Sequence, residues 1–415
     1  MGAKFDQFRR TAIPERPELR TLALSTLINT FGNGLFMTVE VIYFTTVVGL
    51  SPAKVALALS IAGGLSLLFS VPAGHLSDRY GPRNIGAIAY IFEGIFLACL
   101  VFIHTFIPFL LINIACGITG TIGQTMRMAT ISKLGTGEER VAIRAYQRTV
   151  TNLGIALGSV IAGVALGINS KGVYQGMLLA DAFTFILSSL VFLKLPYIAP
   201  TVEKSEPLTF EALRDHRYLG ATVLNGFMSL HFVLQTVAIP LWIVNETNAP
   251  RWWVSVIFVV NTVGVILFQI RASRGSGDVN VGALQFRRAG FAVALACLLY
   301  ALASGVSTLW ACSILVVAMC VHVFGEIVGS AGSWSIGFGL ADEKHQGQYQ
   351  GVYSLSWGVG GTIGPAFVTA MAITIGQLGW VYMAALFAVT GLLMYRLVTK
   401  SWLVLSTGSN QAVIP

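Results

Sequence analysis

Long apolar runs, separated by short polar segments, make up most of this chain. A membrane-spanning helix needs about twenty predominantly apolar residues. Twelve stretches of that kind occur, at residues 21–48, 53–76, 85–104, 106–132, 146–168, 173–194, 218–245, 252–272, 289–306, 308–338, 350–374 and 378–398. Many glycines interrupt these runs, and in lipid such small residues let helices pack closely. The pattern therefore predicts an all-α membrane protein with twelve transmembrane helices.

The longest polar segment between the runs, residues 195–217, lies near the middle of the chain. We interpret it as a cytoplasmic linker between two six-helix halves, residues 1–194 and 218–415. An internal repeat supports the two halves. TLINTFGNGLF aligns with TVLNGFMSLHF, from residues 26 and 222, and RAYQ aligns with GQYQ, from residues 144 and 347. We therefore expect two related bundles of helices.

The composition supports this interpretation and adds an orientation. Hydrophobic residues make up 55% of the chain and charged residues 11%, which are too few charges to cover a large soluble surface. We interpret the net charge of +8 as an orientation signal rather than as a sign of nucleic-acid binding. With both chain ends in the cytoplasm, only three of the 26 Lys and Arg residues are assigned to the outside: Lys54, Lys171 and Arg251. The five cysteines have no metal-ligand spacing, so we expect no metal site.

The segment GHLSDRYGPRN, residues 74–84, is predicted to lie at the cytoplasmic end of the second span and in the short loop to the third. It resembles the signature G-x-L-a-D-r-x-G-r-k of the major facilitator superfamily. The matching residues are Gly74, Leu76, Asp78, Arg79, Gly81 and Arg83, while Pro82 replaces a basic residue. With the twelve spans and the repeat, the resemblance covers nearly the whole chain. It implies the major facilitator fold, two pseudo-symmetric six-helix bundles.

The resemblance also implies a mechanical role for this segment. Asp78 is expected near the N-terminus of the eleventh helix, whose dipole attracts an anion. The signature residues Gly74, Asp78, Arg79, Gly81 and Arg83 would then latch the two halves together on the cytoplasmic side in the outward-facing state. The alternative is that Asp78 and Arg79 merely end and cap the second span. The corresponding segment of the second half, residues 271–288, keeps the arginines but lacks the motif.

Four carboxyl groups lie inside the predicted spans: Glu40, Glu93, Asp181 and Glu326. Ionisable groups at membrane depth are costly and indicate function. The resemblance implies that the first, fourth, seventh and tenth helices line a central cavity, whereas the third and sixth are scaffold. We therefore expect Glu326, and then Glu40, to carry protons. Asp181 and Glu93 are interpreted as packing groups and as the next candidates for proton coupling.

Other polar and large side chains follow the same cavity-lining helices. At about 100° per residue, Asn29, Asn33 and Glu40 share one face of the first span. The candidate substrate-cavity residues are Asn29, Asn33, Phe36, Met37, Asn225, Met228, His231, Gln235, His322, Trp334, Tyr353 and Trp357. The alternative is that the amides and histidines only join helices through hydrogen bonds. A partly apolar cavity with one or two acids suits amphipathic or cationic organic molecules.

YQGVYSLSWG, residues 349–358, resembles drug:proton antiporter-like bacterial members of the superfamily, whereas Asn113 replaces the arginine of their R-x-x-x-G element. The sequence has no ATP-binding loop, catalytic triad or cofactor motif. We therefore expect a monomeric, proton-coupled multidrug exporter of the bacterial cytoplasmic membrane, working by alternating access. Its partners would be a small-molecule substrate, protons and lipid, with no nucleic acid and no cofactor. The alternatives are an uptake symporter or facilitator for a nutrient, and a membrane-embedded enzyme.

Overall fold

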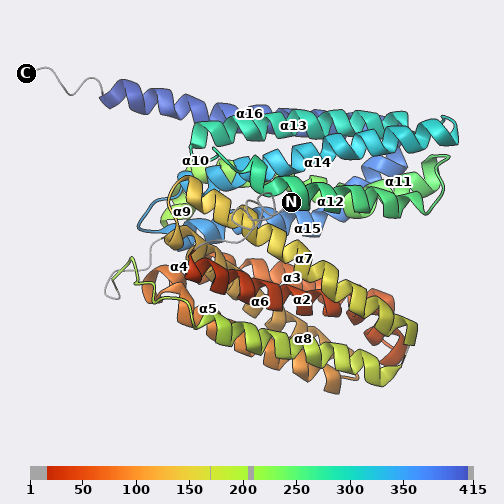
Figure 1. Cartoon of the computed structure of the whole chain (residues 1–415), viewed down its shortest axis with the longest axis horizontal. Helices are drawn as coiled ribbons and strands as arrows, with labels where there is room; N and C mark the ends of the chain where they lie inside the picture. Colours follow the sequence, from red (N-terminus) through yellow and green to blue (C-terminus); the bar gives the residue numbers. More distant parts are fainter. Residues whose placement is uncertain (1–15, 169, 204–209, 410–415) are drawn as a thin grey trace, which may run out of the picture. The chain divides into compact units, whose positions relative to one another are not determined.

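The computed structural model describes residues 16–168, 170–203 and 210–409 (Figure 1). Within these ranges the regular structure is helical, and one isolated antiparallel bridge joins Thr247 to Ser304. Eleven helices are long and apolar enough to span a membrane, or up to twelve if one bent pair forms a single span. The predicted all-α fold is confirmed, and the chain is an integral multi-pass membrane protein. The termini that we placed in the cytoplasm, and residues 204–209 of the predicted linker, lie outside the described residues.

The first half of the chain contains seven α-helices in the described ranges. They are α2 (Pro17–Ile42), α3 (Pro52–Leu67), α4 (Ser70–Tyr80), α5 (Pro82–Cys99), α6 (Phe106–Leu134), α7 (Glu138–Ile168) and α8 (Lys171–Phe192). Helix α2 continues into the π-helical turn η1 (Tyr43–Val47), and α5 ends in the 3-10 turn η2 (Leu100–Phe102). Among these, α2 packs against α8, and α5 packs between α6 and α8.

The second half repeats this arrangement after a short helix, α9 (Glu211–Arg214). Its long helices are α10 (His216–Val233), α11 (Ile239–Glu246), α12 (Trp253–Ala272), α13 (Val279–Leu302), α14 (Thr308–Gly339), α15 (Gln346–Thr369) and α16 (Gln377–Ser409). The π-helical turn η3 (Leu234–Ala238) joins α10 to α11, and η4 (Ala370–Ile375) follows α15. Helix α13 lies beside α14 and α16 (Figure 1), and Trp242, Trp380 and Tyr300 are buried in the core of this half.

The short loop that we predicted between the second and third spans is mostly helical, so that prediction was wrong. Helix α4 continues through Tyr80, and Gly81 alone separates it from α5, which begins at Pro82. Gly81 has a φ of 81°, a conformation that glycine adopts without steric cost. Proline suits the first helical position because its missing N–H would have no intrahelical acceptor there. The apolar run therefore ends before the helix does.

A bend interrupts the second span instead. Helices α3 and α4 meet at an angle of 44°, with Leu68 and Phe69 between them. Pro72 lies in the first turn of α4 and has no N–H to donate to the carbonyl of Leu68, and its ring would clash with that carbonyl in a continuous helix. The proline thus accounts for the position of the break, which the apolar pattern did not predict.

The chain forms two compact units, and each takes a short segment from the opposite half of the sequence. One unit contains the described residues up to Leu134, Tyr146–Phe210 and Asp342–Gly351, and the other contains Gly135–Ala145, Glu211–Ala341 and the described residues from Val352. The first turns of α7 and of α15 thus belong to a different unit from the remainder of the same helix.

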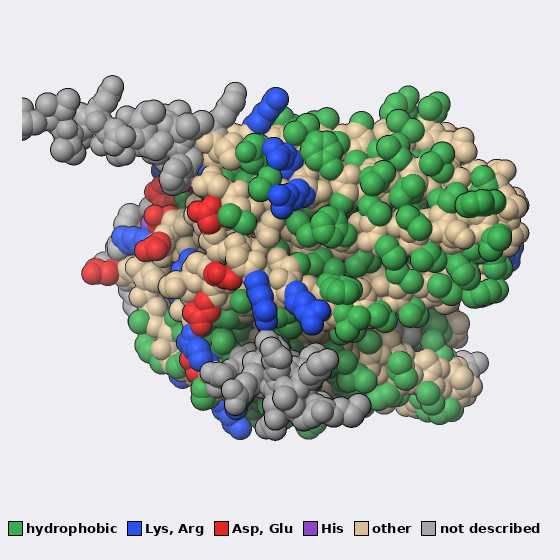
Figure 2. Space-filling view, turned by 45° about the horizontal axis from the view of Figure 1, so that its top comes forward, with side chains coloured by type: hydrophobic (Ala, Val, Ile, Leu, Met, Phe, Trp, Pro, Cys, Tyr) green, Lys and Arg blue, Asp and Glu red, His purple; other side chains and the backbone are tan. Residues whose placement is uncertain are grey.

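Hydrophobic side chains cover much of the visible face of the molecule, whereas charged side chains gather toward one side (Figure 2). Many large apolar residues are exposed, including Phe183 on α8 and Leu309 and Trp310 on α14. An aqueous surface would not carry so many, and a lipid-facing surface does. The distribution agrees with a chain embedded in a bilayer.

Candidate functional site

Asp78 lies near the end of α4, and its side chain is almost fully buried. Its Oδ1 accepts a hydrogen bond from the backbone N–H of Gly347 at 2.8 Å, and its Oδ2 accepts one from the N–H of Gln348 at 2.9 Å. Both N–H groups belong to the first turn of α15, where helical N–H groups lack intrahelical acceptors. The carboxylate therefore caps a helix that is distant in the sequence, at the positive end of its dipole.

Two further contacts hold Asp78 in place. Its backbone carbonyl accepts hydrogen bonds from the N–H groups of Thr201 and Val202, at 2.9 and 3.2 Å. The described part of the linker is therefore bound to the end of α4. The ammonium group of Lys133, on α6, lies 3.8 Å from Oδ1. Three separate segments thus converge on this one residue.

The other signature residues surround this contact. A Cβ atom on Gly74 would overlap the carbonyl group of Gly347, so α4 approaches α15 this closely only because glycine is present. Arg83 donates a hydrogen bond to the carbonyl of Leu195 at 3.2 Å. Arg79 is half-buried, and Gly81 forms the turn between α4 and α5. The signature therefore joins α4 both to the linker and to the first turn of α15.

The second half lacks the signature, but an acidic residue still binds its corresponding loop. Glu138 is the first residue of α7, and its Oε1 accepts a hydrogen bond from the N–H of Gly275 at 2.5 Å. Gly275, between α12 and α13, has a φ of 72°. A Cβ atom on nearby Gly277 would overlap the backbone of Glu138. The sequence analysis missed Glu138, although an acid at the first position of a helix was an available signal.

The carboxyl groups of Glu40, Glu93 and Asp181 lie in one region of the first unit. Asp181 interacts electrostatically with both Glu40 and Glu93, and it accepts a hydrogen bond from the hydroxyl of Thr184 at 3.4 Å. Glu40 Oε1, Glu93 Oε2 and Asp181 Oδ2 have no hydrogen-bond partner among the described residues. Arg127 interacts electrostatically with Glu93. The three acids that we divided between cavity and scaffold are therefore neighbours.

Glu326 lies in the second unit, on α14, with 2% of its surface exposed. Its Oε2 accepts hydrogen bonds from the amide of Gln235 at 2.6 Å and from the amide of Asn261 at 2.8 Å. Gln235 belongs to η3 and Asn261 to α12, so three helices meet at this carboxyl. Both donors are neutral amides, which bind an ionised carboxylate and also the carbonyl oxygen of a protonated acid.

Two histidines form a contact one helical turn before Glu326. His322, on α14, is fully buried, and its Nε2 lies 3.3 Å from Nδ1 of His231 on α10. Nδ1 of His322 lies 3.4 Å from the hydroxyl of Tyr300 on α13. His322 therefore sits between two hydrogen-bonding side chains that come from two other helices.

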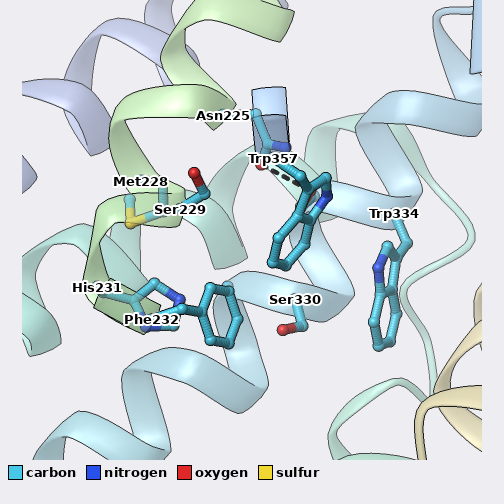
Figure 3. A pocket seen from close by; sticks show the side chains of 10 residues that line it. Asn225, Met228, Ser229, His231, Phe232, Ser330, Trp334 and Trp357 are labelled. Atoms are coloured by element: carbon cyan, nitrogen blue, oxygen red, sulfur yellow. Dashed lines mark hydrogen bonds between the residues drawn. The ribbon is translucent and has the colours of Figure 1, made fainter. Parts of the chain in front are cut away.

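His231 borders a small recess of about 20 Å³, room for one water molecule (Figure 3). The recess is lined by Asn225, Met228, Ser229, His231, Phe232, Gly329, Ser330, Ser333, Trp334 and Trp357. Asn225 holds its polar side: it donates to Ser356 at 2.8 Å and accepts from Ser333 at 2.7 Å. Ser333 also lies 3.0 Å from the hydroxyl of Tyr353.

Aromatic rings form the other side of the recess (Figure 3). The rings of His231 and Phe232 have centroids 3.9 Å apart, and those of Phe232 and Trp357 are 4.9 Å apart. The guanidinium group of Arg144 lies 5.8 Å from the ring centroid of Trp334. Flat, polarisable surfaces of this kind favour planar or cationic ligands.

The predicted cavity residues separate into two sets. Most of those of the second half line the recess or contact a residue that lines it: Asn225, Met228, His231, His322, Trp334, Tyr353 and Trp357. Gln235 binds Glu326 instead. Those of the first half lie on α2, where Asn29 is buried, Asn33 and Phe36 are half-buried and Met37 is 69% exposed. The sequence analysis missed Asn261, Tyr300 and Ser356. A single asparagine within the apolar α12 was the signal for the first of these.

A larger groove, of about 540 Å³, lies between α10, α15 and α16. Its lining is apolar and includes Phe227, Leu230, Ile363 and Phe367. It offers almost no directed hydrogen bonds to a ligand, so we assign the candidate polar and aromatic contacts of a substrate to the residues around the smaller recess, which admits only a water-sized group in this structure.

Residues 22–365 match the family model of the Major Facilitator Superfamily. No curated protein sequence matches the chain. Among solved structures, the human organic anion transporter MFSD10 (TETRAN) is similar, with a TM-score of 0.70 and 15% identity over 92% of this chain and 100% of the other. A bacterial homologue of the iron transporter ferroportin, in an outward-facing state, has a TM-score of 0.71 and 13% identity over 93% of this chain and 99% of the other. The proton:xylose symporter XylE has a TM-score of 0.66 and 13% identity over 92% of this chain and 95% of the other.

Proposed function

Because this chain belongs to the Major Facilitator Superfamily, a family of membrane transporters for small molecules, we propose that it is a proton-coupled exporter of amphipathic or cationic organic compounds. The observation that carries the proposal is the environment of Glu326, a buried carboxyl held by two neutral amides on two other helices. Such a group can be charged in one state of the transport cycle and neutral in another.

Burial penalises the charged form of a carboxyl, because the group loses its hydration. The amides of Gln235 and Asn261 compensate for part of that loss without fixing the charge, since they donate to a carboxylate and, more weakly, to the carbonyl oxygen of a protonated acid. Alternating access of water from either side of the membrane would then load and release a proton at Glu326, and the same movement would carry the substrate.

The substrate class follows from the recess. Aromatic rings of Phe232, Trp334 and Trp357 stand opposite a small number of polar groups around Asn225. A sugar needs many directed hydrogen bonds, which this surface does not offer in comparable number, whereas a planar organic cation gains from stacking and cation–π attraction. The opposite direction of transport is the second candidate, because a proton:xylose symporter shares the fold.

The proposal includes an arrangement in the membrane. We infer two six-helix bundles, residues 1–194 and 218–415, in a monomer with both termini in the cytoplasm of a bacterial cell. The Asp78 contact with the first turn of α15 supports a cytoplasmic latch that stabilises the outward-facing state.

The function is tested in proteoliposomes with an imposed pH gradient. We expect ethidium and tetraphenylphosphonium, which are permanent cations, to accumulate in vesicles with an acidic lumen, because outward proton flow drives them inward. Nigericin should abolish the accumulation, and protein-free vesicles should show none. Accumulation of D-xylose in vesicles with an alkaline lumen would favour the symporter instead. No gradient-driven movement of any of these compounds would contradict proton coupling.

The orientation predicts which sites face the outside. In a cysteine-free background, Gly172→Cys and Asn248→Cys should react with an impermeant thiol reagent in intact cells, whereas Thr136→Cys and Glu203→Cys should react only after permeabilisation. All four positions are exposed in the structure. Thr136 is chosen over Gly137, whose φ of 47° disfavours a side chain. Reversed labelling would contradict the orientation.

A further inference from the structure

We propose that His231 and His322 form a proton-transfer pair that carries positive charge from the recess to a buried position beside Glu326. The inference rests on the proposed proton coupling and adds a route for the proton. It begins from a geometric fact: His322 Nε2 and His231 Nδ1 are 3.3 Å apart. In a hydrogen bond between two neutral imidazoles, one nitrogen donates and the other accepts.

The two rings differ in their surroundings. His231 lines the recess, where a water molecule fits, and its side chain is buried against Phe232. His322 is fully buried, away from the recess lining. A proton that enters at the recess therefore meets His231 first, and the hydrogen bond leads from there into the core of the second unit.

The proton transfer starts from the tautomer of His231 that carries its hydrogen on Nδ1, which faces the unprotonated Nε2 of His322. A hydronium ion that reaches the recess transfers a proton to Nε2 of His231 and becomes water. The Nδ1–H bond of that ring then breaks as an N–H bond forms at Nε2 of His322. His231 is left neutral with its hydrogen on Nε2, and the positive charge resides on His322.

Burial opposes a positive charge on His322, and a nearby carboxyl offsets part of that cost. Glu326 is four residues further along α14, on the same helical face, and interacts electrostatically with His322. The Tyr300 hydroxyl, on α13, accepts from Nδ1 of a protonated His322 at 3.4 Å. Cys297 and Cys320 are the other titratable neighbours of Tyr300. An anionic Glu326 thus attracts the proton inward from the recess.

The pair also supplies a reason for exchange between substrate and proton. A cation stacked on Phe232 and Trp357 would lie beside His231, since the two rings neighbour each other and His231 contacts Phe232. Like charges repel strongly in a low-dielectric site. A cationic group of the substrate at these rings and a protonated His231 would therefore exclude each other, which is the competition that an antiporter requires.

The test combines a spectroscopic and a transport measurement on the full chain in lipid. With ¹⁵N-labelled histidine, we expect magnetic resonance to show a scalar coupling between two imidazole nitrogens through the shared hydrogen. His231→Gln and His322→Gln should each remove it. His322→Gln, at a residue that is not part of the recess lining, should also lose acid-driven ethidium accumulation while keeping ethidium exchange without a gradient. His231→Gln should lose the accumulation as well. His104→Gln, at an exposed loop position, is the matched control and should behave as the wild type.

The outcomes separate the two proposals. If His231→Gln accumulates ethidium with the wild-type pH dependence, the pair is not the proton route. If the wild type itself ignores the pH gradient, the proposed function fails, and the nitrogen coupling decides whether the histidines share a proton. Absence of that coupling in the wild type overturns the inference. Loss of exchange together with accumulation in His322→Gln would indicate a structural role and would also overturn it.

Discussion

Glu326→Gln is expected to abolish accumulation of substrate driven by a pH gradient and to leave exchange at equilibrium intact. Glutamine has the shape of glutamate, and its side-chain carbonyl still accepts a hydrogen bond from Gln235 or Asn261. It binds no proton near neutral pH, so the cycle loses its coupling reaction. Exchange of one substrate molecule for another needs no net proton movement and therefore survives.

The measurement is ethidium uptake by proteoliposomes, with and without an acidic lumen, alongside counterflow of ethidium across vesicles without a gradient. Glu343→Gln, at an exposed position after α14, removes the same charge elsewhere and should not alter either rate. Gradient-driven accumulation by Glu326→Gln with normal pH dependence would transfer the coupling role to Glu40, Asp181 or Glu93. Each of those three acids would then be replaced by its amide, and the variants would be measured in the same assay.

Asp78→Asn is expected to weaken the contact between α4 and α15 and to impair transport while leaving the helices folded. Asparagine loses the charge at the positive end of the α15 dipole and one of the two oxygen acceptors for Gly347 and Gln348. A carboxylate at a helix N-terminus contributes about 1 kcal/mol, and up to roughly 2 kcal/mol when partly buried. Conformational populations should therefore change by several-fold to about thirtyfold.

Distances between spin labels on the cytoplasmic side should report this change as a larger inward-facing population. Asp278→Asn is the matched control, because Asp278 caps α13 through the N–H groups of Asn280 and Val281 and does not bind α15. It removes the same charge at a helix N-terminus. Wild-type distances and normal transport in Asp78→Asn would leave Asp78 with no more than a capping role.

The sequence predicted the helices well because a membrane requires each span to be long and apolar, and that requirement is local. The exceptions arose where the helix and the apolar run end at different residues. Asp78 and Arg79 are polar, yet they continue α4, since a helix can leave the apolar layer before it stops. Pro72 interrupts the second span inside the apolar run. The residues on both sides of this break are apolar, so their hydropathy does not reveal it.

The candidate site was predicted less completely, because contacts between helices depend on rotation and neighbours. The periodicity of α14 placed His322 and Glu326 on one face, but nothing in the sequence pairs His322 with His231 on another helix. Asn261 was missed because the resemblance directed attention to the first, fourth, seventh and tenth helices, whereas its helix, α12, is the eighth span. Glu40 and Asp181 were separated for the same reason, although side chains from two helices meet wherever small residues such as Gly32 allow it.

The π-helical turn η3 gives the seventh span a way to change partners without moving its ends. A π turn holds an extra residue, and such turns are frequent at functional sites. If the π turn shifts by one residue along the helix, the side chain of the residue that leaves the turn rotates about the helix axis by roughly 100°. Gln235 lies within η3 and binds Glu326. A one-residue slide would withdraw this amide from the carboxyl, so the local winding of one helix would decide which hydrogen bonds a residue on another helix receives.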